Sequence, residues 1–176
     1  KRMTNLEGPF RVWVVLKKLM KREGRQPDDM IATGGYVGGQ EVTTVMSLDL
    51  VTMRYTILAP MITARSDHAT AVLDGKLFVM GGYNDGYLSS VECLDLETGQ
   101  RSAMAPMITP RDSHGAAVLG GKIYVAGGFD GHAHQTLVES FDAATNQWTA
   151  VTPMNTRRRD HGLVSAQGKL LSLIHI

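Results

Sequence analysis

The chain has 176 residues, of which 43% are apolar, and a formal net charge of +1 at pH 7. This apolar content is enough for one globular domain, whereas the near-neutral charge argues against nucleic acid or a membrane surface as a partner. No apolar run is long enough to span a membrane, and the single cysteine, Cys93, excludes an intrachain disulfide and favours a reducing, cytoplasmic location.

The first 28 residues differ in composition from the rest. The stretch FRVWVVLKKLMKREG begins apolar and becomes basic, with Val12, Leu16 and Leu19 near helical spacing, before a glycine and a proline break the pattern. We expect residues 1–28 to form a short helix or a linker, either the end of an upstream domain or sequence foreign to the remainder of the chain. Because the chain opens at Lys1 and not at a methionine, we interpret it as a piece of a longer protein.

From residue 29 onward the chain repeats itself. Glycine pairs begin at Gly34, Gly81 and Gly127, 47 and 46 residues apart, and Pro-Met pairs and Arg-x-x-His motifs keep the same phase. Residues 59–82 and 105–128 share about 15 identities in 24 positions, which excludes chance similarity. The repeats divide into a partial unit at 29–61, complete units at 62–107 and 108–154, and a partial unit at 155–176.

Each complete unit predicts four short strands. The stretch HATAVLDGKLFVMGG contains two β-rich runs around the hairpin signal Asp74-Gly75. The following VECLDL alternates apolar and polar residues, and Thr98-Gly99 turns the chain into a fourth strand. The glycine pair closes the second strand, where the lack of β-carbons lets neighbouring backbone approach.

The glycine pair, VECLDLETGQ or VESFDAATNQW, the Pro-Met pair and the R..H motif resemble the kelch repeat over residues 29–176. The repeats are most similar to those of the kelch-like adaptors, which carry BTB and BACK domains upstream. The resemblance implies an all-β fold, a partial kelch β-propeller of about three four-stranded blades in antiparallel meanders. Since propellers close with about four to eight blades, we expect an open arc with exposed strand edges.

Several positions depart from the kelch pattern. The expected tryptophan, Trp148, is Tyr55 in the first unit and Arg101 in the second, which predicts looser packing there. Met53 replaces a turn glycine or asparagine. Ile174-His175 stands where a glycine pair is expected, so the tail is either divergent or non-native.

The candidate binding residues lie on one predicted face. In a meander of strands a to d, the b-to-c loop and the d-to-a connection emerge on the same side, and the variation in repeat length falls within the b-to-c loop. By resemblance to kelch-like adaptors, substrate contacts flank the glycine pair and the start of strand a. The candidates are Tyr36, Arg65, Asp67, Tyr83, Asn84, Arg111, Ser113, Phe129, Asp130, His132, His134, Arg159 and Asp160. Two alternatives stay open: the recurring arginines could hydrogen-bond between blades, and the aromatic residues could pack within the loops.

No enzyme, cofactor or metal site is expected. One histidine per blade, at His68, His114 and His161, separates the rings by a whole blade, whereas metal ligands must converge on one ion. No nucleophile elbow or phosphate loop occurs, and the tyrosines do not assemble a copper site of the galactose oxidase type.

The sequence therefore predicts a protein–protein interaction module. The resemblance implies the substrate-recognition propeller of a cullin-type ubiquitin ligase adaptor, with the ligase bound through upstream domains. The alternative is an actin-binding, cytoskeletal kelch protein. An upstream BTB domain would favour the first interpretation, and co-sedimentation with actin would favour the second.

Overall fold

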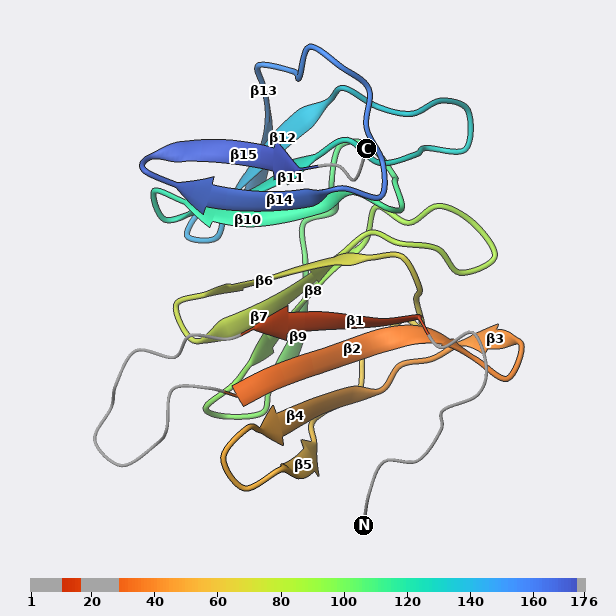
Figure 1. Ribbon diagram of the computed structural model, residues 1–176, viewed down its shortest axis with the longest axis vertical. Coiled ribbons are helices and arrows are strands. Elements are labelled where there is room, and N and C mark those ends of the chain that lie inside the picture. The colour runs from red at the N-terminus through yellow and green to blue at the C-terminus, as the bar shows by residue number, and fades with distance from the viewer. Residues whose placement is uncertain (1–10, 17–28, 174–176) are drawn as a thin grey trace.

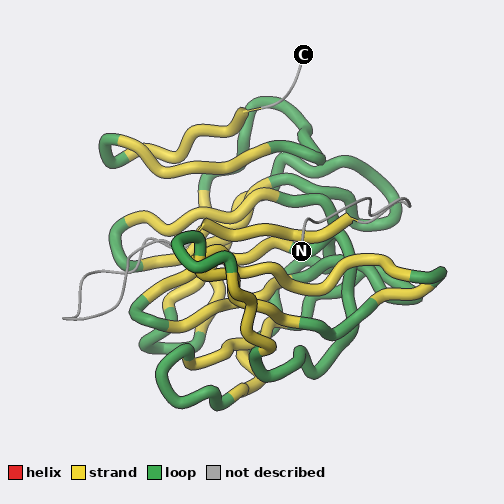
Figure 2. The backbone as a smooth tube through the Cα atoms, turned by 60° about the horizontal axis from the view of Figure 1, so that its bottom comes forward, coloured by secondary structure: helices red, strands yellow, loops and turns green. Residues whose placement is uncertain are grey.

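The computed structural model describes residues 11–16 and 29–173. These residues form strands joined by loops, and Figure 2 shows no helix among them. Accordingly, the described part of the chain has no helix that could cross a membrane.

Two sheets repeat the same four-stranded meander. The second blade consists of β6 (Ala69–Leu73), β7 (Lys76–Met80), β8 (Val91–Asp95) and β9 (Arg101–Met104). The third consists of β10 (Gly115–Leu119), β11 (Lys122–Ala126), β12 (Val138–Asp142) and β13 (Gln147–Val151). Neighbouring strands pair antiparallel in chain order, and the sheets follow one another along the long axis in Figure 1. The predicted all-β arrangement of four-stranded blades is confirmed.

The first blade also has four strands in line, three of them from the predicted partial unit at 29–61 and one from the segment before it. It contains β2 (Asp29–Val37), β4 (Val45–Asp49) and β5 (Arg54–Ile57), while β3 (Gln40–Glu41) extends a hairpin from β2. Its fourth strand is β1 (Arg11–Leu16), which pairs antiparallel with β2. The predicted helix is therefore wrong at β1, since a run rich in valine suits a strand that pairs with a free sheet edge. The rest of the predicted segment, residues 1–10 and 17–28, lies outside the described residues.

The last sheet is a hairpin of β14 (Gly162–Ala166) and β15 (Lys169–Leu173). Within the described ranges, β15 hydrogen-bonds to β14 alone. The described residues of the last unit thus form two strands.

The tight turns match the sequence signals. Asp74 and Gly75 both have positive φ, 49° and 74°, as a two-residue hairpin turn requires. In the turn before the fourth strand, Met53 has φ 55°, at the position where the other blades place Gly99 and Asn146. Methionine is an unusual residue for this left-handed conformation.

Apolar clusters fill the space between successive sheets. Ile31, Val45 and Leu77 belong to the cluster shared by the first two blades. Between the second and third blades, Phe78 packs edge-on against Phe141 with ring centroids 5.8 Å apart. The first and second blades therefore each bury an apolar face against the blade that follows.

The glycine pairs make room for the following blade. A β-carbon on Gly81 would lie 2.6 Å from the carbonyl oxygen of Arg111 and 2.8 Å from Cε1 of His114. The next glycine, Gly82, donates its N–H to the same Arg111 carbonyl at 2.9 Å. The predicted close approach of backbone at the glycine pair is confirmed, and the recurring histidine and the methionine of the Pro-Met pair fill the space beside Gly81.

Candidate functional site

The connections between the second and third strands of the blades project on one side of the molecule. Figure 1 shows the β2–β3 hairpin, the β7–β8 connection and the β11–β12 connection all on the right. Residues 81–90 make the β7–β8 connection, and residues 127–137 make the longer β11–β12 connection. We call this side the loop face. The predicted difference in loop length lies on it.

An aromatic row runs along the loop face across two blades. Tyr83 packs edge-on against Tyr87 at 5.4 Å between ring centroids, and Tyr87 packs against Phe129 at the same distance. Phe129 in turn meets the exposed ring of His134 at 5.5 Å. Gly131 lies against Tyr87, where a β-carbon would come within 2.7 Å of the ring. The row therefore joins the two loops into one surface.

Asp130 organises the longer loop. Its Oδ1 accepts hydrogen bonds from the backbone N–H groups of His132 and Ala133, both at 2.8 Å, and its Oδ2 accepts one from the Gln135 side chain at 2.6 Å. The backbone N–H groups of Ala133 and His132 hold the pKa of Asp130 below its usual value. Asp130 thus shapes the loop, while the His132 side chain is exposed at its tip.

The connectors that enter successive blades are joined by their main chains. The Ser113 N–H donates to the Asp67 carbonyl at 2.8 Å, and the Asp160 N–H donates to the Ser113 carbonyl at 2.9 Å. All three residues have positive φ, between 51° and 52°. The result is a continuous main-chain hydrogen-bonded line across three successive connectors.

Acidic side chains gather beside the aromatic row. The pKa of Asp112 is raised to about 6, because the carboxyl is partly buried and lies near the negative charges of Asp67 and Asp160. Its Oδ1 is buried and accepts no hydrogen bond from the described residues. Arg159 pairs with Asp160 at 3.3 Å and places its guanidinium 5.9 Å from the centre of the Phe129 ring. The face therefore combines negative charge with partly exposed aromatic rings.

Two of the predicted contacts are wrong, since Arg65 and Arg111 are fully buried. Arg65 donates to the carbonyls of Gly81 at 2.7 Å and Ser90 at 3.1 Å and pairs with Glu92 at 2.7 Å. Arg111 makes the equivalent pair with Glu139. Their side chains bond within their own blade, and their carbonyls accept from the glycine pair of the preceding blade. A surface partner therefore meets neither guanidinium.

The remaining predicted residues lie on the loop face. Tyr36 stands in the β2–β3 hairpin and is 40% exposed. Sequence reasoning omitted Tyr87 from the candidates. For Tyr87 a signal existed in the sequence. Tyr87 follows the loop aromatic Tyr83 after three residues, and the candidate His134 follows the equivalent aromatic Phe129 after four. The other candidates on or beside this face are Asp67, Tyr83, Asn84, Ser113, Phe129, Asp130, His132, His134, Arg159 and Asp160.

The recurring histidines are buried between the blades. His68 bonds through Nε2 to the Thr33 hydroxyl at 2.7 Å, whereas neither ring nitrogen of His114 has a hydrogen-bond partner in the described part of the chain. Burial, and secondarily the charge of Arg65, lowers the pKa of His68 to about 3. Over residues 11–16 and 29–173, no group of three histidine, cysteine, aspartate or glutamate side chains is placed to hold a metal ion.

The comparisons with known proteins agree with this architecture. The family described as the KLHDC2/KLHL20/DRC7 Kelch-repeats domain matches residues 27–174. No curated protein matches the chain significantly. The family match spans the four sheets from β2 onward, and with the repeated glycine pairs and four-stranded meanders it shows that the chain belongs to the kelch-repeat domains.

Proposed function

We propose that the loop face binds an extended segment of a target protein. A kelch-repeat domain is a general protein-binding module. The observation that supports this face as the binding surface is the aromatic row from Tyr83 to His134, which is continuous across two blades and lies beside Asp112. Aromatic side chains next to charged groups are enriched at protein interfaces.

The charges near the row define the chemistry of the target. Asp112 stands near Asp67 and Asp160, so a lysine or arginine of the target would relieve their mutual repulsion. An apolar residue next to that cation would cover the rings of Tyr87 and Phe129. We therefore infer that the target presents a basic residue beside an apolar one.

The wider role in this proposal is that of the substrate receptor of a cullin-type ubiquitin ligase, acting in the cytoplasm. Such a receptor works by recruitment, because it raises the effective concentration of the target near the ligase without chemistry of its own. The resemblance of the repeats to kelch-like adaptors supports this role. Contact with the cullin would belong to domains other than the propeller.

Selection of peptides tests the loop face. A random peptide library would be panned against the chain, and the selected peptides would be titrated against the Phe129→Ala variant and against Gln100→Ala as a control. Gln100 is exposed in the turn between β8 and β9, away from the b-to-c loops. We expect Phe129→Ala to weaken binding by at least about tenfold and Gln100→Ala to leave it unchanged. Peptides indifferent to Phe129→Ala would refute the proposed face.

The ligase role needs a separate experiment with the full-length gene product. Tagged protein would be precipitated from cells and probed for a cullin, and purified protein would be tested for co-sedimentation with actin filaments. Recovery of a cullin supports the adaptor role. Co-sedimentation with actin and no cullin would replace it with the cytoskeletal role.

A further inference from the structure

One position of the connectors carries a different side chain in each unit. It is the residue after the recurring arginine, namely Ser66, Asp112 and Arg159. In the third blade, the Asp112 N–H donates to the Phe129 carbonyl, and the Phe129 N–H donates back to the Asp112 carbonyl, both at 3.0 Å. Ser66 and Tyr83 make the same pair of bonds in the second blade, at 3.0 and 2.8 Å. Because backbone groups hold this position against the loop, its side chain can change while the loop stays in place.

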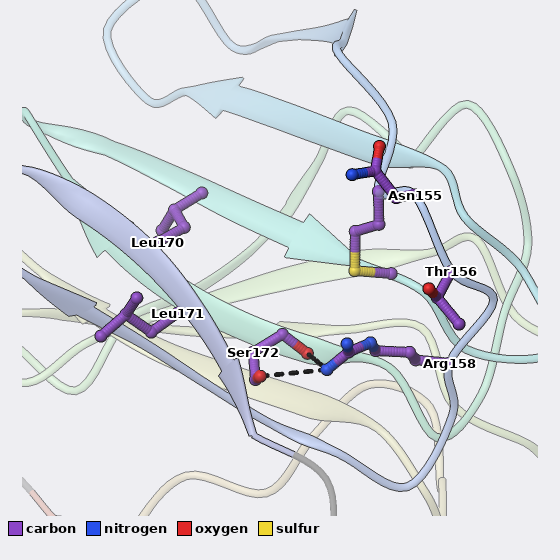
Figure 3. A pocket seen from close by; sticks show the side chains of 7 residues that line it. Asn155, Thr156, Arg158, Leu170, Leu171 and Ser172 are labelled. Carbon is purple, nitrogen blue, oxygen red and sulfur yellow. Dashed lines mark hydrogen bonds between the residues drawn. The ribbon is translucent and has the colours of Figure 1, made fainter.

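In the last unit this position supplies a cation to the aromatic row. The Arg159 guanidinium lies 5.9 Å from the centre of the Phe129 ring, which belongs to the preceding blade, and it pairs through Nε with Asp160 at 3.3 Å. Its neighbour Arg158 turns away, since it donates to the Ser172 carbonyl at 3.0 Å and to the Ser172 hydroxyl at 3.3 Å (Figure 3). The rings of the row therefore accept a guanidinium beside a carboxylate.

Between the second and third blades the same position is an acid. The pKa of Tyr87 is raised by desolvation first and by the negative charge of Asp112 second, so the carboxylate and the phenol ring lie near each other. Within the described part of the chain, no cation lies over the Tyr87 ring. The surface here thus presents a carboxylate beside a partly exposed ring.

The charges around Asp112 come from both neighbouring connectors. Burial raises the pKa of Asp112 to about 6, the negative charges of Asp67 and Asp160 act in the same direction, and Arg159 lowers it. The carboxyl is therefore largely ionised at pH 7.4. Because Arg159 is already paired with Asp160, a cation from a partner meets a net negative environment at Asp112.

An arginine can contact both the carboxylate and the ring at once. Its guanidinium is planar, so it stacks on an aromatic face while its N–H groups donate to a carboxylate, as Arg159 does with Phe129 and Asp160. A lysine ammonium is a compact, strongly hydrated charge on a flexible stem. Asp112 therefore favours a cation, and Tyr87 favours a flat one.

We propose that Asp112 sets the charge preference of the loop face and selects an arginine of the target, whose guanidinium lies between the Asp112 carboxylate and the Tyr87 ring. The preference rests on the proposed function of the loop face, and it narrows the basic residue of the target to arginine. The aliphatic part of that arginine and the adjacent apolar residue cover the rest of the row.

Four short peptides that differ at one residue test the preference. The peptide acetyl-GGXLGG-amide, with arginine, lysine, citrulline or glutamate at X, would be titrated against the chain at pH 7.4, and the ring signals of Tyr87 and Phe129 would be followed by NMR. We expect the arginine peptide to bind at least about fivefold tighter than the lysine peptide and about tenfold tighter than the citrulline peptide. Citrulline keeps the planar shape without the charge. All four titrations use the unaltered protein, so a folding defect cannot mimic the result.

Substitution of Asp112 then assigns the preference to its carboxylate. Asp112→Asn should remove the advantage of arginine over citrulline. Asp112→Arg, which copies the residue of the last unit, should weaken the arginine peptide at least about tenfold and make the glutamate peptide the tighter of the two. Glu97→Gln, an equal loss of charge at an exposed residue of the β8–β9 turn, should change neither preference. Nuclear Overhauser contacts between Tyr87 and Phe129 verify that the row is intact in each variant.

Equal binding of the arginine, lysine and citrulline peptides would overturn the proposal. The same holds if the arginine peptide causes no saturable shift of the Tyr87 signals at millimolar concentration, or if the arginine preference survives in Asp112→Asn. Panned peptides that need Phe129 but bind Asp112→Asn as tightly as the unaltered protein would remove the role of Asp112 and leave the proposed loop face in place.

Discussion

Arg101 and Trp148 occupy equivalent positions in successive blades and make the same hydrogen bond. Arg101 donates from Nη2 to the Ala59 carbonyl at 2.7 Å, and the Trp148 indole N–H donates to the Ala105 carbonyl at 2.9 Å. Each acceptor belongs to the connector that leaves the preceding blade. The guanidinium thus replaces the indole as the donor to this carbonyl, and it also contacts Glu92 at 3.4 Å.

Replacing Arg101 tests this equivalence. We expect Arg101→Ala to lower the free energy of unfolding by about 2 kcal/mol, since it removes the bond to Ala59 and leaves Glu92 with one cation fewer. Arg101→Trp should recover part of the loss by restoring a donor to the Ala59 carbonyl. Urea unfolding of the two variants measures both effects, and equal stability of the two would contradict the shared role.

Met53 is a place where substitution should stabilise the protein. Its φ of 55° lies in the left-handed region, which costs roughly 1 kcal/mol for a residue with a β-carbon. Met53→Gly should therefore raise the thermal midpoint, because the side chain is 66% exposed and little packing is lost. The matched change Asn146→Gly should lower it, since Asn146 Oδ1 accepts the Ala105 N–H at 2.9 Å. A fall in midpoint for Met53→Gly would show that its side chain stabilises the turn.

The buried histidines predict acid sensitivity. Burial lowers the pKa of His68 to about 3 and that of His114 well below its usual value, whereas both titrate near pH 6.5 when unfolded. Below pH 6.5 the unfolded state thus binds more protons than the folded state. The free energy of unfolding therefore has its full histidine contribution above pH 6.5 and falls as the pH drops toward the pKa values of the folded state. His68 alone accounts for roughly 2 kcal/mol between pH 6.5 and pH 5.

Protonation of Asp112 raises the free energy of unfolding between pH 6.5 and pH 5, opposite to the effect of the histidines. Its pKa of about 6 exceeds that of an unfolded aspartate, so the folded state takes up this proton first as the pH falls. Urea unfolding at several pH values should show a net loss toward pH 5, and a steeper loss in Asp112→Asn. Stability that is constant or rising from pH 6.5 to pH 5 in Asp112→Asn would refute the histidine effect.

Gly131 allows the aromatic row to form. Its φ is 97°, and a β-carbon there would come within 2.7 Å of the Tyr87 ring. We expect Gly131→Ala to displace that ring and abolish nuclear Overhauser contacts between Tyr87 and Phe129. Gly86 in the neighbouring loop has open space around it, so Gly86→Ala is the matched control and should preserve the contacts. Unchanged contacts in Gly131→Ala would mean that the row tolerates a β-carbon.

The repeat made most of the fold predictable. Glycine pairs, hairpin signals such as Asp74-Gly75 and alternating strands fix the four-stranded meander, because each blade satisfies its own local pattern. The strand β1 was not predictable, since it lacks the repeat landmarks and depends on the free edge of β2. Pairing with the edge of β2 overrides the weak helical spacing of this apolar run.

The candidate site was predictable as a face but only partly as a set of residues. Chain reversal at each strand places the loops together, which located Tyr83 and Phe129. Burial was harder to predict, because Arg65 carries a charge and its partner Glu92 lies 27 residues away in sequence. Charged side chains enter a core when they are paired, and a single repeat does not identify the partner.

The main-chain hydrogen bonds through Asp67, Ser113 and Asp160 hold the blades together without using the side chains that a target would contact. These residues keep neighbouring blades in register with N–H and carbonyl groups, which every residue except proline possesses. Their side chains can therefore vary, provided that the replacement tolerates a positive φ, as glycine and asparagine do. The scaffold can thus acquire a different target preference at its rim without a change in the contacts that hold the blades together.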